Sequence, residues 1–142
     1  MRVLLIMAFS LHALSCKTPK DLQTYKVPEA PGPMSCVIHA EVLSPLSGAT
    51  TDDSLCSIYP CKARVRIIDI VSCGSSVSLF FNAGDTLTVQ FAYTLHNTKK
   101  LFPKMQEHYP GLKKGDIFFT AAEQRMRPGT GEYFLIYGYK RE

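Results

Sequence analysis

The sequence lacks the motifs that most directly indicate an enzyme. It contains no G-x-S-x-G elbow for a serine nucleophile and no C-x-x-C pair of zinc ligands. Its serines lie in turn-rich stretches such as GSSVS and SPLSG, and its cysteines have other expected uses, set out below. We therefore predict that the protein is not an enzyme and that it holds neither a cofactor nor a metal ion.

A long apolar run and a strong charge excess are also missing. The apolar stretch VLLIMAFSLHAL, residues 3–14, is too short to cross a bilayer as a lasting helix. The formal net charge is only +4, which argues neither for nucleic acid nor for strong attraction of the whole chain to acidic lipid. We therefore expect no nucleic-acid partner.

The apolar stretch has the form of a signal peptide instead. A single basic residue, Arg2, precedes it, and the small residues Ala13 and Ser15 follow at the spacing that signal peptidase reads. We predict that residues 1–15 are a signal peptide and that Cys16 is the first residue of the mature chain. Export would place the remaining cysteines in an oxidising compartment.

The stretch ALSC, residues 13–16, resembles the lipobox of bacterial lipoproteins. In that family the cysteine after the cut carries diacylglycerol and anchors the chain to a membrane. The resemblance implies an extracytoplasmic protein that is lipid-anchored through Cys16 to a bacterial membrane. The outer membrane is the expected one, with the protein on its periplasmic or surface side. The alternative is plain secretion, with Cys16 free or in a disulfide.

The number of cysteines agrees with an anchor at Cys16. Five cysteines in an oxidising compartment leave one unpaired, and a lipid on Cys16 accounts for it. Cys36 opens one expected strand and Cys73 ends the next, so they meet if the strands are antiparallel. Cys56 and Cys61 enclose a short loop that is easily closed. We favour the disulfides Cys36–Cys73 and Cys56–Cys61 over the other connectivities.

Metal binding is the alternative use of these residues. Cys56 and Cys61 could bind zinc together with a histidine, although secreted cysteines usually oxidise. The candidate histidines are His39, His96 and His108. Asp52 and Asp53 could bind calcium weakly, but a solvated turn explains a pair of aspartates in a loop of small polar residues better.

The mature chain divides into a tether and one domain. Residues 16–33 contain four prolines and few apolar side chains, so we expect a flexible, semi-extended spacer. Residues 34–142 are of the size of a single domain and can bury one core.

The domain has the pattern of an all-β fold, because its apolar residues recur with a period of two between turns. In residues 62–73 the neighbouring Ile67 and Ile68 break the alternation, which predicts a β-bulge. Residues 96–116 lack alternation, and 104–108 have room for one or two helical turns between prolines. The expected strands are 34–43, 62–73, a short one within 76–85, 86–95, 117–126 and 132–140.

This order of elements resembles the OB-fold, a five-stranded Greek-key barrel with one short helix between strands 3 and 4. The resemblance implies a small barrel over residues 34–140; a β-sandwich is the alternative. The stretches VIHAEV and YFLIYGY are also similar to the netrin-type module of tissue inhibitors of metalloproteinases. Those inhibitors use an N-terminal Cys-x-Cys, whereas Lys17 and Thr18 follow Cys16. This second resemblance therefore implies the barrel and no inhibitory residues.

Two surface features are candidate sites. Tyr133, Tyr137 and Tyr139 share one face of the last expected strand and could stack on a sugar or peptide ligand, although barrel interiors also take tyrosines. Lysines around the crossover could face anionic lipid or a polyanionic wall polymer, but Glu107 and Asp116 interrupt them, which favours a solvated rim. These lysines are Lys99, Lys100, Lys104, Lys113 and Lys114.

Together these patterns predict a membrane-anchored, non-catalytic binding module for an envelope protein or glycan. Three alternatives stay open: a protease-inhibitor-like module with a free N-terminal cysteine, an enzyme built on a loop metal, and a purely structural envelope protein.

Overall fold

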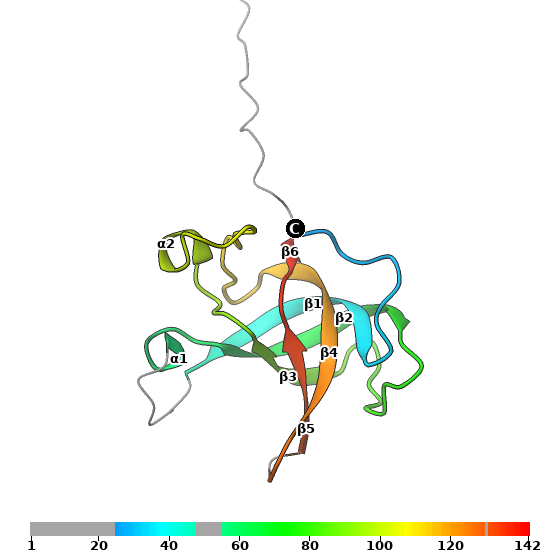
Figure 1. Ribbon diagram of the computed structural model, residues 1–142. Helices are drawn as coiled ribbons and strands as arrows, with labels where there is room; N and C mark the ends of the chain where they lie inside the picture. Colours follow the sequence, from blue (N-terminus) through cyan, green and yellow to red (C-terminus); the bar gives the residue numbers. More distant parts are fainter. Residues whose placement is uncertain (1–24, 48–54, 130) are drawn as a thin grey trace, which may run out of the picture.

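The computed structural model describes residues 25–47, 55–129 and 131–142 and places them in one β-barrel (Figure 1). Two single-turn helices lie in the described connections, α1 (Leu55–Ile58) and α2 (Thr98–Leu101). The strands are β1 (Ser35–Leu46), β2 (Lys62–Cys73), β3 (Thr86–Phe91), β4 (Ile117–Arg127), β5 (Gly131–Ile136) and the short β6 (Lys140–Arg141).

The pairing of the strands is that of an OB-like barrel. The pairs β1–β2, β2–β3 and β4–β5 are antiparallel, whereas β3 and β5 run parallel. β1 also pairs with β4, from Ser35 opposite Glu123 to Glu41 opposite Ile117, and this second pairing closes the sheet. A closed five-stranded barrel with a short helix between β3 and β4 confirms the predicted fold class.

Alternate side chains of the strands fill the barrel, as the period of two predicted. In β1 the inward residues Ile38, Ala40 and Val42 are buried. The predicted bulge is also present: in the pairing of β2 with β1, Ile67 lies opposite Ala40 and Ile68 has no partner. The bulge lets β2 bend along the curved wall of the barrel.

One predicted strand is absent, because residues 76–85 form a loop. The side chain of Gln124 in β4 takes the place of a neighbouring strand. Its Oε1 accepts hydrogen bonds from the N–H groups of Ser78 and Leu79, at 2.8 and 3.3 Å. The alternation in this segment reflects inward packing, with Phe81 buried in the core.

The helix of the crossover lies at residues 98–101 and not at 104–108. Asn97 starts it, because its side-chain oxygen accepts a hydrogen bond from the N–H of Lys99 at 2.9 Å. Pro103 restricts the backbone of the residue before it, which ends the helix after one turn.

The described end of the expected tether lies against the barrel. Tyr25 is half-buried, and its ring centroid lies 6.4 Å from that of Tyr109. It also packs so closely on Gly138 that a Cβ added there would lie 2.6 Å from the ring of Tyr25. Pro33 accepts a hydrogen bond from the N–H of Ser76 at 2.9 Å. The chain therefore contacts the folded domain from residue 25, ahead of the boundary expected at residue 34.

Candidate functional site

The structure separates the three tyrosines of the expected stripe. β5 ends at Ile136, and the chain bends at Tyr137 before β6, so one alternation does not run through all three. Tyr133 is half-buried and Tyr137 is 48% exposed, but Tyr139 is only 3% exposed. Tyr139 therefore belongs to the core, and only the other two lie on the outer surface.

Tyr139 packs at one end of the barrel. Its ring centroid lies 5.0 Å from that of Tyr109 and about 6 Å from those of two phenylalanines, Phe91 and Phe118. Its hydroxyl oxygen accepts a hydrogen bond from the N–H of Gly111 at 2.9 Å. Burial raises the pKa of Tyr139 to about 12.

This raised pKa predicts a loss of stability in alkali. Below pH 10 the Tyr139 hydroxyl is protonated in both states, and above it the unfolded chain ionises first and becomes favoured. We expect this residue to lower the free energy of unfolding by roughly 2–3 kcal/mol between pH 10 and pH 12. Urea titrations at a series of pH values should show a shallower decline for Tyr139→Phe than for the wild type. Tyr137→Phe removes a hydroxyl from an exposed position and is the control.

The outer surface of the barrel carries a basic face, formed by Lys62, Arg64, Gln90, Arg127 and Tyr133. The first two project from β2, where Lys62 lies opposite Gln90 of β3. Arg127, at the end of β4, donates a hydrogen bond from Nη2 to Oε1 of Gln90 at 2.8 Å. Its guanidinium carbon lies 4.8 Å from the ring centroid of Tyr133, which is a cation–π contact.

A groove of about 200 Å³ runs along this face between β2, β3 and the β4–β5 hairpin. Lys62, Gln90, Arg127 and Tyr133 line it together with one carboxylate, that of Glu132. A fixed arginine, an amide and an aromatic ring are groups that bind acidic or hydroxyl-rich ligands. The arrangement is suited to holding such a ligand.

Tyr137 extends the outer surface beyond the groove. Its hydroxyl accepts a hydrogen bond from Nη2 of Arg125 at 2.9 Å. The carboxylate of Glu123 lies 2.9 Å from the same nitrogen, and its charge raises the pKa of Arg125. Arg125 is thus neutralised by a neighbour, so Tyr137 adds a polar contact more than a positive charge.

The sequence interpretation missed the basic members of this face. The signal was present, because Lys62 and Arg64 alternate with the buried Ala63 and Val65. Alternation shows that such residues are exposed, but it does not show which strand lies next to them. β3 pairs with β2 on one side and with β5 on the other, so the strand that bears Tyr133 lies one strand away from these basic residues.

Both expected disulfides are present, Cys36–Cys73 and Cys56–Cys61. The zinc alternative is therefore wrong for this structure, since Cys56 and Cys61 are bonded to each other. Among the residues that the structure describes, no group of three or more His, Cys, Asp and Glu side chains could hold a metal ion. Two disulfides are compatible with an extracytoplasmic location.

Two histidines of that alternative, His39 and His96, pack against aromatic rings. His39 stacks on Phe119 with a centroid distance of 4.0 Å, and His96 packs against Tyr59 at 4.7 Å. Asp52, Asp53 and Cys16 lie outside the described residues.

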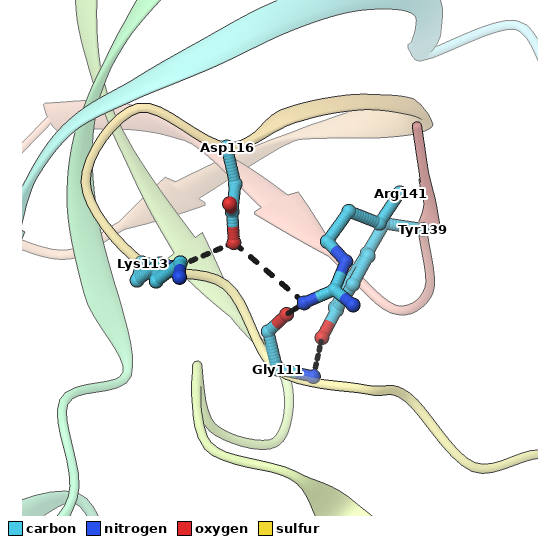
Figure 2. A network of polar contacts seen from close by, with 5 residues as sticks. All are labelled: Gly111, Lys113, Asp116, Tyr139 and Arg141. Carbon is cyan, nitrogen blue, oxygen red and sulfur yellow. Dashed lines mark hydrogen bonds and ion pairs between the residues drawn. The ribbon is translucent and has the colours of Figure 1, made fainter.

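A second cavity of about 330 Å³ lies where β6 meets the segment before β4. Figure 2 shows the polar network on its wall. Arg141 donates a hydrogen bond from Nη1 to the carbonyl oxygen of Gly111 at 3.2 Å and lies 3.8 Å from Oδ2 of Asp116. That carboxylate also accepts a hydrogen bond from the N–H of Lys113 at 2.9 Å. These contacts fasten the segment before β4 to the C-terminal strand.

No protein-family model, curated protein or solved structure matches the chain. Within the described ranges, no helix has both the length and the apolar character that a membrane span needs. The function is therefore argued from the geometry of the basic face.

Proposed function

We propose that the protein is a bacterial lipoprotein, anchored through Cys16, whose barrel is a non-catalytic binding module for an envelope glycan or protein. The proposed ligand surface is the basic face. One observation carries the proposal: Arg127 lies on the ring of Tyr133 and donates to Gln90 within one groove. The face of strands 2 and 3, together with the loop between strands 4 and 5, is also where OB-folds bind oligomeric ligands.

Among envelope components, an acidic glycan fits the basic face best. Arginine forms charge-assisted hydrogen bonds to carboxylates, and a tyrosine ring offers a flat surface on which a sugar can stack. Lys62 and Arg64 add positive charge along the neighbouring strand. Nucleic acid could use similar groups, but an exported protein would not meet it in the cell envelope.

Calorimetric titration with an oligogalacturonate as the acidic probe tests the ligand class. We expect Arg127→Ala to weaken binding by tenfold or more, because a charge-assisted hydrogen bond is worth about 1.5–3 kcal/mol. Lys114→Ala removes one exposed positive charge from the segment before β4, outside the residues that line the groove, and should change the affinity by less than about twofold. Equal losses in the two variants, or equal binding of a neutral oligosaccharide, would count against an acidic-glycan site.

Mass spectrometry of the mature protein tests the anchor separately. We expect Cys16 to be the first residue and to carry the mass of a diacylglycerol. A free N-terminal Cys16 would contradict the lipoprotein proposal and would favour the inhibitor-like module, whose chemistry needs an unmodified N-terminus.

A further inference from the structure

The end of the barrel around α2 and β6 is a second charged surface, which we call the basic end. It comprises residues 97–116 and 140–142, whose seven lysine and arginine side chains all belong to exposed residues. The seven are Lys99, Lys100, Lys104, Lys113, Lys114, Lys140 and Arg141. Three carboxylates lie in the same segments, those of Glu107, Asp116 and Glu142.

Each of these carboxylates lies beside a group that is not a lysine side chain. Glu107 accepts a hydrogen bond from a tyrosine hydroxyl at 3.3 Å, Asp116 faces Arg141 at 3.8 Å, and Glu142 lies 3.2 Å from His39. In the part of the chain that the structure describes, none of the six lysines of the basic end forms a salt bridge. The lysines are therefore available to an external anion.

The chain enters the fold at this same end. Tyr25 packs on Tyr109, and Tyr109 is tied to α2 by a hydrogen bond from its N–H to Oγ1 of Thr98 at 2.7 Å. The ring of Tyr109 also lies 5.0 Å from that of Tyr139, beside β6. Figure 1 shows the first described residues next to β6 and the β4–β5 hairpin at the opposite end of the molecule.

A lipid on Cys16 would lie within a short length of chain from Tyr25 and the basic end. Residues 17–24 separate Cys16 from Tyr25, and an extended chain of that length spans at most about 30 Å. An anchor at Cys16 therefore holds the basic end near the bilayer. Each lysine that reaches an anionic surface increases the affinity for that surface by about fivefold.

We infer that the basic end docks on the anionic lipid headgroups of the membrane that carries the anchor. This inference rests on the proposed lipid anchor at Cys16. Docking in this orientation directs the β4–β5 hairpin, and with it the groove of the basic face, away from the bilayer. The two surfaces then have separate roles, one toward lipid and one toward the ligand.

A Cys16→Ser chain, exported and processed, tests the surface without the anchor. Its sedimentation with vesicles of phosphatidylcholine plus phosphatidylglycerol should be at least tenfold stronger than with phosphatidylcholine alone at low salt. In this background, replacing Lys100, Lys104 and Lys114 by glutamine should weaken binding to the anionic vesicles by tenfold or more. The control replaces Lys62, Arg64 and Arg66 by glutamine, which removes three positive charges from β2, one of them paired with Glu41, and should change binding by less than about threefold.

Two outcomes would overturn the inference. Equal losses in the two triple variants would show that net charge alone attracts the chain, and equal binding to both kinds of vesicle would show that headgroup charge is not recognised. Unchanged urea midpoints would show that both variants are folded. An unmodified Cys16 in the wild-type protein would contradict the anchor, but the vesicle result would still be interpretable because the tested chain has none.

Discussion

Replacing Cys36 and Cys73 together by alanine is expected to lower the free energy of unfolding by about 4 kcal/mol. The bridge joins residues that are 37 positions apart, so its loss frees a long loop in the unfolded chain. Since domains of this kind are stable by roughly 5–15 kcal/mol, the loss is a large part of the total. Urea denaturation followed by far-ultraviolet circular dichroism measures it.

The position of this bridge adds a structural reason. Cys36 is fully buried, lies opposite Cys73 in β2, and also lies opposite Ala122 in β4. The bridge therefore holds the place where three strands of the barrel meet. Alanine is the suitable replacement at this site, because serine would bury a hydroxyl group without an assured partner.

The second disulfide is the matched control. Cys56 and Cys61 are only 5 positions apart, so their replacement by alanine should cost about 2 kcal/mol. Entropy of the unfolded chain explains the difference between the two pairs. If the short bridge cost as much as the long one, strain or packing in the folded state would have to dominate instead.

The parts of the fold that the sequence predicted are those set by local alternation. The alternation of Val65 and Ile67 with arginines predicts the strand at residues 62–73, and the adjacent pair Ile67 and Ile68 predicts its bulge. Cys36 and Cys73, at opposite ends of consecutive strands, correctly indicated an antiparallel pair. Each of these features depends on neighbouring residues or on the pairing of two consecutive strands, so it can be predicted from the sequence alone.

The predictions that were wrong concern features set by contacts between segments that are distant in the sequence. Residues 76–85 alternate like a strand, but two of their N–H groups, those of Ser78 and Leu79, donate hydrogen bonds to the side chain of Gln124. No local sequence pattern could show this contact. The tyrosine stripe fails for a similar reason, because the chain bends at Tyr137. A Cβ added to the next residue, Gly138, would lie 2.5 Å from the hydroxyl of Tyr109, so close packing from another segment demands glycine beside this bend.

The candidate site was only half predictable for the same reason. Tyr133 was identified from its own strand, but its arginine partner was not, because the contact depends on how the β4–β5 hairpin closes. Lys62 and Gln90 join them only through the order of strands in the closed sheet. A binding face on a barrel is assembled from several strands, so its composition follows from topology.

Phe118→Ala is expected to lower the free energy of unfolding by about 3–5 kcal/mol. Phe118 is fully buried, and its ring centroid lies 6.1 Å from those of both Phe91 and Tyr139. Its backbone lies opposite Ala40 of β1 and Arg141 of β6, so the cavity would open beside the seam that closes the barrel. Urea denaturation measures the loss, and faster amide hydrogen exchange in β1 would show that the seam itself is weakened.

Phe119→Ala provides the control on the opposite face of the same strand. Phe119 is half-buried and stacks on His39 at 4.0 Å, so its removal should cost about 1–2 kcal/mol, from the stacking and part of the apolar burial. The two variants remove the same atoms from adjacent residues, and only the direction of the side chain differs. If Phe119→Ala were the more damaging, the inside and outside of β4 would be reversed, and with them the surface on which Arg127 meets Tyr133.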